Sequence, residues 1–379
     1  PILLLSKKEN ILPDNLAPDT NALGLMLPYT PLHYLLLKHL EALLGKDNLP
    51  VLVMTSGNKS SEPIALGNRE ALERLSAIAD LFLLHNRDIL IRCDDSVLRI
   101  KPELQQALHY RRARGFTPSP VFLKNKGPEV LGLGPEKKAT ICLSKGDQAF
   151  MSQHIGDLHN PETFDFYCQS IEHLQNILQV RPQALVCDLH PDYLSTAYAR
   201  EQSKLPVFFL QHHYAHIYAV LAENKFSGPA LGLALDGTGL GEDQTLWGGE
   251  LIYVDNAQNQ QKRLGHLSPV ILPGGERAVL EPWRTAQSYL YALNIKNPNN
   301  RKWPWLDKHA PAADVVMQII EKNINSPLSS SCGRLFDAVS ALLGLCLNLE
   351  YEGQAAICLE NIQDFSENKA YTCPVYKDK

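Results

Sequence analysis

Two histidines and an aspartate have the types and spacing of a metal site. His212 and His216 are four residues apart, and good helix formers begin at Ala215, so both imidazoles would lie on one face of a first helical turn. The apolar segment LGLALD, residues 231–236, reads as a buried strand that ends in Asp236. Imidazole and carboxylate are common ligands of divalent metals. A His-x-x-x-His pair alone is more often an ordinary helix face, and the nearby aspartate shifts the balance toward a metal.

A glycine-containing segment follows Asp236 directly. Gly237, Thr238 and Gly239 predict a tight turn. Backbone N–H groups in such a turn can face a phosphate. We therefore expect a combined site for a metal and nucleotide phosphates, with His212, His216 and Asp236 as its catalytic and metal-binding residues.

A second candidate site lies nearer the N-terminus. Residues 51–54 read as a buried strand that runs into Thr55, Ser56, Gly57 and Asn58. Hydroxyl and amide groups at the mouth of a strand suit a polar ligand. The same residue types are also typical of a capped turn, which is the commoner outcome.

A polar and charged stretch precedes the expected domain boundary: Asp94, Asp95 and Ser96, followed by Arg111, Arg112 and Arg114. The arginines either contact phosphate or solvate the boundary. The following segment has three prolines and a glycine, which indicates a linker over 115–128. We therefore expect one domain over 1–114 and another over 129–379.

The second domain contains two similar segments. Residues 130–157 and 230–255 each read as a strand, a glycine-containing loop and further strands, and each precedes a helix, over 161–178 and 281–293. A duplicated strand–loop–strand unit is typical of actin-like nucleotide-binding folds, although two unrelated hairpins could resemble each other by chance. The expected fold class is α/β, with an actin-like second domain.

Two further glycine positions are nucleotide-binding candidates. Gly274 and Gly275 precede an expected short helix. Gly333 and Asp337 lie one turn apart on an amphipathic helix over 329–345. A helical glycine beside an aspartate can admit a flat ligand, although close helix packing is the commoner reason for such a glycine.

Composition limits the classes of function. The 379 residues include 36 basic and 41 acidic ones, for a net charge of -5, with no long run of one sign. This balance favours small-molecule or protein partners over nucleic acid or membrane. The eight cysteines form no C-x-x-C pair, which fits a reducing cytoplasm. The chain starts without methionine, inside an expected strand, and we expect a fragment.

Many short motifs together resemble one family: LPYTPLH, MTSGN, RCDDSV, RRARGFTP, SQHIGDL, CDLHPDYLST, QHHYAH, ALDGTGLGEDQTLWGGE, PGGERAVLEPWR, GRLFDAVSALLG and YEGQAA. They resemble HypF carbamoyltransferases, the maturation factors of nickel–iron hydrogenases. The resemblance implies a partial YrdC-like domain followed by a TsaD-like domain of the actin-like (ASKHA) class, truncated at its C-terminus. It also implies that the first domain forms carbamoyl-adenylate and the second transfers the carbamoyl group to a thiolate.

The resemblance also implies roles for individual residues. Ser56 and Asn58 match the adenylate site of the YrdC-like domain, with Asp95, Ser96 and Arg112 as further candidates. The pair His212 and His216 matches the family's metal-binding motif, and Asp236 is similar to a further ligand. The glycines after Asp236 are similar to the phosphate loop, and Gly333 and Asp337 to ribose-contacting residues.

The implied cofactors are ATP, with Mg²⁺, and a divalent metal, either zinc or iron. The implied partners are carbamoyl phosphate and the C-terminal cysteine of a HypE-like protein. The family's acylphosphatase-like domain, its zinc-finger cysteines, a Lys-x-Arg opening and a glycine-rich C-terminal segment have no counterpart in this sequence. Two alternatives stay open: a tRNA threonylcarbamoyladenosine-type transferase, and a non-catalytic actin-like scaffold that binds nucleotide.

Overall fold

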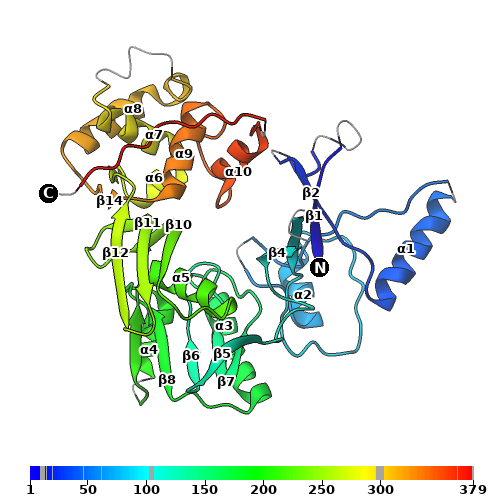
Figure 1. Cartoon of the computed structure of the whole chain (residues 1–379). Helices are drawn as coiled ribbons and strands as arrows, with labels where there is room; N and C mark the ends of the chain where they lie inside the picture. Colours follow the sequence, from blue (N-terminus) through cyan, green and yellow to red (C-terminus); the bar gives the residue numbers. More distant parts are fainter. Residues whose placement is uncertain are drawn as a thin grey trace.

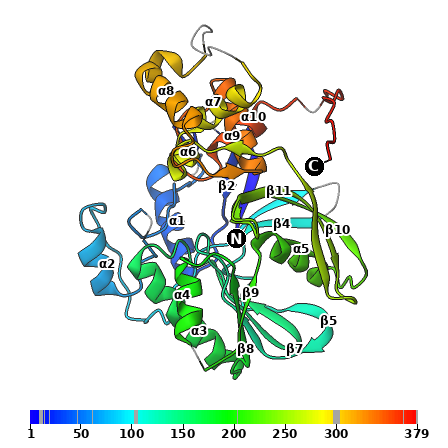
Figure 2. The same cartoon turned by 90° about the vertical axis from the view of Figure 1, so that its left-hand side faces the viewer.

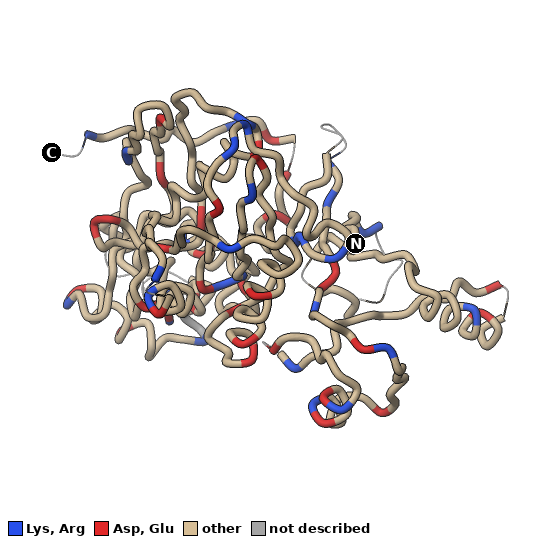
Figure 3. Tube along the Cα trace, turned by 90° about the horizontal axis from the view of Figure 1, so that it is seen from below, with Lys and Arg blue, Asp and Glu red and all other residues tan. Residues whose placement is uncertain are grey.

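The computed structural model describes residues 1–8, 13, 15–18, 20–45, 47–60, 62–101, 106–202, 204–295, 303–364 and 366–377. In this part of the chain, three β-sheets and the helices between them make a mixed α/β structure (Figure 1). Acidic and basic residues are interspersed along the trace (Figure 3). No described helix combines the length and apolar character that a membrane span requires.

The N-terminal unit is a four-stranded sheet with two helices. Its elements are β1 (Ile2–Ser6), β2 (Ala22–Leu25), α1 (Pro31–Leu44), α2 (Asn68–Leu75), β3 (Val97–Lys101) and β4 (Gln106–Arg111), with sheet order β2-β1-β3-β4. Helix α1 begins where the hydroxyl of Thr30 accepts the N–H of His33 and proline fills the first turn. It ends before Gly45, which has a φ of 85°.

The strand predicted for residues 51–54 is wrong. This segment has no regular secondary structure and pairs with no strand among the described residues, and Val53 is 81% exposed. A β-strand needs a neighbour that takes up its N–H and C=O groups. Residues 51–54 therefore have high β propensity but have no neighbouring strand to pair with among the described residues.

The middle sheet contains β5 (Val121–Gly127), β6 (Val130–Gly132), β7 (Cys142–Met151), β8 (Ala184–Asp188) and β9 (Val207–Leu210), in the order β5-β7-β6-β8-β9. Its helices are α3 (Pro161–Leu178) and α4 (Leu194–Glu201). Helix α3 has the predicted bounds and turns Phe166, Tyr167 and Ile171 into the core beneath the sheet. The Tyr167 hydroxyl donates to the carbonyl of Leu133 at 2.8 Å.

Two expectations for this region need correction. The segment 115–128, predicted as a linker, contains strand β5, which pairs with β7. The further strands expected after the glycine-containing loop of 130–157 form one strand, β7, in which Gly146 has a φ of 60°. The register between β5 and β7 shifts because residues 122–127 of β5 lie opposite only residues 146–148 of β7. Prolines and glycines can mark an edge strand or a bulge as well as a loop.

The third sheet contains β10 (Ala230–Leu240), β11 (Leu246–Asp255), β12 (Gln260–His266), β13 (Val270–Ile271) and β14 (Leu328–Ser329). Its order is β10-β11-β14-β13, with β12 also paired to β11. Helix α5 (His212–Glu223) connects the middle sheet to this one and packs on β10 and β11 through Tyr214 and Ile217. Both sheets therefore position the start of α5.

The two predicted copies share only their first hairpin. Antiparallel pairs β6–β7 and β10–β11 open the two halves. On its other side β6 has the parallel strand β8, whereas β10 pairs with β11 alone among the described strands. The similarity between the two halves is therefore strongest in the hairpins β6–β7 and β10–β11.

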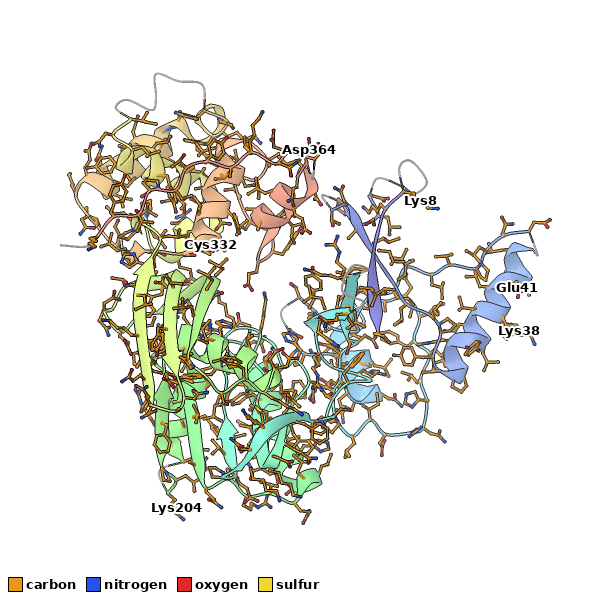
Figure 4. All side chains as sticks on the ribbon, in the orientation of Figure 1. Lys8, Lys38, Glu41, Lys204, Cys332 and Asp364 are labelled. Atoms are coloured by element: carbon orange, nitrogen blue, oxygen red, sulfur yellow. The ribbon has the colours of Figure 1, made fainter. Side chains whose placement is uncertain are left out.

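The remaining helices gather at one end of the third sheet (Figures 1 and 2). They are α6 (Glu276–Leu280), α7 (Pro282–Ala292), α8 (Leu306–Glu321), α9 (Cys332–Leu342) and α10 (Gln354–Asn361). Figure 4 shows Cys332, the first residue of α9, at the junction of these helices with the sheet. The N-terminal unit contacts α10 through hydrogen bonds between Asn21 and Asn361.

Candidate metal centre and nucleotide site

Helix α5 begins at His212, three residues earlier than the helix formers indicate. The side chain of Gln211 caps it, because its Oε1 accepts the N–H groups of His213 at 2.7 Å and Tyr214 at 3.1 Å. Helix N-termini need such acceptors for their free N–H groups. The cap places His212 and His216 on the same face, one turn apart.

His212, His216 and Asp236 converge on one point. The Nε2 atoms of the two histidines are 3.2 Å apart. Asp236 Oδ2 lies 3.3 Å from His212 Nε2 and 3.8 Å from His216 Nε2. Ligand atoms at about 2.1 Å from a tetrahedral metal are about 3.4 Å from one another. Asp236 Oδ2 is enclosed and makes no hydrogen bond, so the three residues fit a divalent ion.

Asp188 orients His212 from behind. The Oδ2 atom of Asp188 lies 2.8 Å from His212 Nδ1, and Asp188 is only 7% exposed. If Nδ1 carries the proton and donates to this carboxylate, Nε2 is free to coordinate a metal. A carboxylate behind a ligand histidine fixes the ring and raises its basicity. Asp188 ends β8, directly beside β9, the strand that leads into α5.

We expect Asp188→Asn to weaken metal binding by about 10- to 100-fold, the usual range for such supporting groups. The asparagine keeps the size of the side chain but loses the charge that holds the His212 ring. Competition with a chromogenic zinc chelator measures the affinity. Asp192→Asn, at an exposed position after the same strand, is the matched control. An unchanged zinc affinity in Asp188→Asn would show that this carboxylate does not support the centre.

The charges of the cluster are strongly coupled. Burial lowers the pKa of His212, but the nearby carboxylates of Asp188 and Asp236 outweigh burial and raise the pKa to about 9. Burial raises the pKa of Asp236, but its interaction with His212 dominates and brings the pKa to about 2. Without a metal, a proton on His212 therefore balances the carboxylates. Metal binding would release that proton.

The tight turn predicted at Gly237, Thr238 and Gly239 is wrong. Strand β10 continues to Leu240, and residues 236–238 form a bulge opposite the single residue Gly248. The hydroxyl of Ser331, the N-cap of α9, lies 2.7 Å from the carbonyl oxygen of Gly237. A bulge redirects the side chains of the bulged strand. Here Asp236 belongs to the bulge.

The glycines of this segment allow close approaches. A Cβ on Gly239 would lie 2.7 Å from Cε1 of His213 and 3.0 Å from Cβ of His212. A Cβ on Gly333 would lie 2.9 Å from the Cα of Gly237. Gly239 thus gives the histidines room, and Gly333 lets the first turn of α9 touch the bulge.

Asp337 lies one turn further along α9 and is 2% exposed. Its Oδ2 is 3.0 Å from a guanidinium nitrogen of Arg334. Burial raises the pKa of the Asp337 carboxyl to about 6, and Arg334 offsets this only in part. The structure thus brings Gly333 against Gly237, with Asp337 on the same helix.

The raised pKa of Asp337 predicts a pH-dependent stability. Because the fold favours the protonated carboxyl, the stability it contributes is complete below its ordinary pKa of 3.8 and is lost as pH rises through about 6. Relative to Asp337→Asn, the wild type should lose on the order of 2–3 kcal/mol of unfolding free energy between pH 4 and pH 7. Urea unfolding of both proteins across this range measures the difference. Parallel pH profiles would contradict the assignment.

The backbone N–H groups of the other predicted glycines are hydrogen-bonded within the protein. The N–H of Gly274 donates to the carbonyl of Asn325, and that of Gly275 to the carbonyl of Leu272. Both have positive φ, 88° and 59°. Their nucleotide-binding role stays a prediction.

The N-terminal candidates do not form one cluster. Among the described residues, no hydrogen bond or ion pair links Ser56 or Asn58 with Asp95, Ser96 or Arg112. Asn58 Nδ2 donates to the carbonyls of Lys59 and Glu62, as in a capped turn. The fully buried Ser96 hydroxyl donates to the carbonyl of Arg114 and accepts the N–H of Ala113, which is a structural role.

Asp95 and Arg112 are also engaged. The Tyr29 hydroxyl donates to Asp95 at 3.1 Å, and Arg112 donates to the carbonyl of Ser119 at 2.7 Å. Burial lowers the pKa of Arg112. No described contact places either residue at an adenylate site, and that assignment stays a prediction.

The site residues predicted from the sequence did not include three that matter here: Asp188, Gln211 and His213. Asp188 could have been found, because it ends a buried strand immediately before the strand that leads to the histidines, and the carboxyl ends of neighbouring parallel strands meet at one edge. Gln211 is not among the usual N-cap residues, so sequence rules miss it.

The fold and the site define an α/β protein with a YrdC-like unit and two Kae1-like halves, the halves carrying a His-His-Asp cluster between them. Residues 1–112 match the telomere recombination family of YrdC-like proteins, 125–223 match the HypF Kae1-like domain, and 232–379 match the second subdomain of the carbamoyltransferase Kae1-like domain. The chain belongs to the HypF carbamoyltransferase family.

Individual relatives agree with these family matches. Carbamoyltransferase HypF2 of Cupriavidus necator is 47% identical over 378 residues, which cover 96% of this chain and 46% of the relative. Carbamoyltransferase HypF of Rhizobium leguminosarum bv. viciae is 43% identical, over 95% of this chain and 46% of the relative. The chain thus spans about half the length of these curated relatives.

The structure is also similar to solved HypF structures. A crystal structure of full-length HypF in a phosphate- and nucleotide-bound form matches with a TM-score of 0.90 and 40% identity. That match covers 100% of this chain and 57% of the solved chain. The T. kodakarensis HypF structure matches with a TM-score of 0.87 and 36% identity, over 95% of this chain and 48% of the solved one.

Proposed function

We propose that this chain contains the carbamoyl-transfer site of a HypF-type enzyme. In this proposal the Kae1-like halves pass the carbamoyl group of carbamoyl-adenylate to the C-terminal cysteine of a HypE-like protein, in the synthesis of cyanide ligands for hydrogenase. The YrdC-like unit takes part in making the adenylate from ATP and carbamate derived from carbamoyl phosphate. Family membership and the nucleotide-bound HypF neighbour support the assignment.

The observation that carries the proposal is the convergence of His212, His216 and Asp236 beside the bulge of β10, with atoms 3.2 to 3.8 Å apart. Three protein ligands on one side leave further coordination positions for substrate oxygens. Imidazole and carboxylate accept either zinc or iron, so the donor set is compatible with both. A bound divalent ion would supply Lewis-acid polarisation of phosphate or carbamoyl oxygens.

The proposed reaction is an acyl transfer. The cysteine thiolate attacks the carbamoyl carbon, the bond from that carbon to the adenylate oxygen breaks, and AMP leaves as a thiocarbamate forms. The residues of this chain would mainly orient the reactants. The close contact of Gly333 with Gly237 brings the N-terminus of α9 to the bulge, where its N–H groups favour an anionic phosphate.

The test is transfer of the carbamoyl group from carbamoyl-adenylate, generated by an active YrdC-type enzyme, to a peptide with the HypE C-terminus. We expect mass spectrometry to show one carbamoyl group on the peptide cysteine with the zinc- or iron-loaded chain, and none with Asp236→Asn. A peptide ending in serine and an unmodified tRNA are the control acceptors. Modification of tRNA but not of the peptide, or of neither, would refute the proposed acceptor.

A further inference from the structure

His213 lies between the two candidate histidine ligands and is not one of them. Its side chain is completely buried, and its Nε2 lies 3.8 Å from Asp236 Oδ2. Both atoms are enclosed by protein, and neither makes a hydrogen bond. A buried polar atom without a partner costs about 1–3 kcal/mol, so the facing pair requires an explanation.

Gln211 determines which nitrogen of His213 carries the proton. Because its Oε1 accepts two backbone N–H groups of α5, the orientation of its amide is fixed. The amide nitrogen, Nε2, donates to the carbonyl of Leu240 at 3.0 Å and lies 2.9 Å from His213 Nδ1. An amide nitrogen can only donate, so His213 Nδ1 must accept. The ring proton of His213 is therefore on Nε2, which faces Asp236.

Oδ2 of Asp236 faces Nε2 of His213 as well as Nε2 of the two candidate ligand histidines. The other carboxylate oxygen, Oδ1, accepts the N–H of Gly237 at 2.6 Å. The missing side chain of Gly239 lets the His213 ring lie against β10, since a Cβ there would be 2.7 Å from its Cε1. On its other side the ring packs near Trp247, with centroids 6.0 Å apart. The ring is thus held in place by packing as well as by Gln211.

We infer that His213 is a positioning residue: its Nε2–H faces Asp236 Oδ2 at 3.8 Å, and the electrostatic attraction between the two groups orients that carboxylate toward the metal. The inference rests on the metal centre of the proposed function and assigns it a second supporting group. Asp188 holds His212 by its outer nitrogen, and the Gln211–His213 pair holds Asp236. Supporting groups behind metal ligands typically change metal affinity by about 10- to 100-fold.

Two substitutions separate the electrostatic effect of the N–H group from the packing of the ring. In His213→Gln, the amide nitrogen can take the place of Nε2–H, whereas His213→Leu fills similar space without a donor. We expect His213→Leu to lower zinc affinity about 10- to 100-fold in chelator competition, and His213→Gln to stay close to wild type. Thermal unfolding of the metal-free proteins controls for folding. Equal losses of zinc affinity in the two variants would overturn the inference.

The tautomer is measured independently on the metal-free wild-type chain. Long-range proton–nitrogen correlation spectra with ¹⁵N-labelled histidine should show a protonated Nε2 and an unprotonated Nδ1 for His213, assigned by comparison with His213→Gln. A protonated Nδ1 would overturn the inference even if His213→Leu failed to fold. If the wild type bound no zinc, the proposed function would fail, while the spectrum would still decide the tautomer.

Discussion

Replacing His216 with alanine is expected to reduce zinc affinity by at least about 100-fold, which corresponds to about 2.8 kcal/mol of binding free energy. His216 supplies one of the three converging ligand atoms. Among the described residues, no fourth His, Cys, Asp or Glu joins this cluster to replace it. Its side chain is 55% exposed, so alanine should leave the fold intact. Chelator competition and metal analysis of the dialysed protein measure the loss.

The control for this prediction is His39→Ala. His39 is an exposed histidine of α1 in the N-terminal unit, whereas the cluster residues belong to α5 and β10. The substitution His39→Ala removes one imidazole from the chain but leaves the proposed metal ligands unchanged. Equal zinc content in His216→Ala, His39→Ala and the wild type would mean that the imidazole pair does not bind metal.

Gly333→Ala is expected to cost about 1–3 kcal/mol of stability, as overpacking usually does. The added Cβ would lie 2.9 Å from the Cα of Gly237 and 3.3 Å from the carbonyl oxygen of Asp236. Both obstacles are backbone atoms, so α9 and the bulge must move apart. Because the proposed phosphate contacts lie there, we also expect weaker AMP binding. Urea unfolding and calorimetric titration with AMP measure the two effects.

Gly265→Ala is the matched control for this substitution. Gly265 lies in β12, and a Cβ there would meet no atom within 4 Å. Its variant should therefore unfold and bind AMP like the wild type. If Gly333→Ala behaves like Gly265→Ala in both measurements, the close contact between α9 and β10 has no role in the site.

The sequence predicted the regular elements best where apolar spacing and a cap agreed. Helix α3 has its predicted bounds, with proline at its start and Asn160 as its N-cap. Residues 51–54 have an equally clear apolar run, yet form no strand, because strand formation depends on a partner that no local pattern encodes. Strand β5 was missed for the converse reason, since a proline-rich segment found a partner in β7.

The candidate site was predicted in part. The spacing of His212 and His216 and the end of an apolar strand at Asp236 indicated three ligands, and the structure brings them together. The bulge could not be predicted, because it depends on pairing with Gly248 and on the packing of α9. The role of Gln211 depends on two contacts that meet only after folding, a helix N-terminus and the ring of His213.

Anomalous diffraction from crystals of this chain grown with zinc tests the central claim most directly. We predict a zinc peak about 2.0–2.2 Å from Nε2 of His212, Nε2 of His216 and Oδ2 of Asp236. A zinc ion bound elsewhere, with these three side chains uncoordinated at saturating zinc, would contradict it.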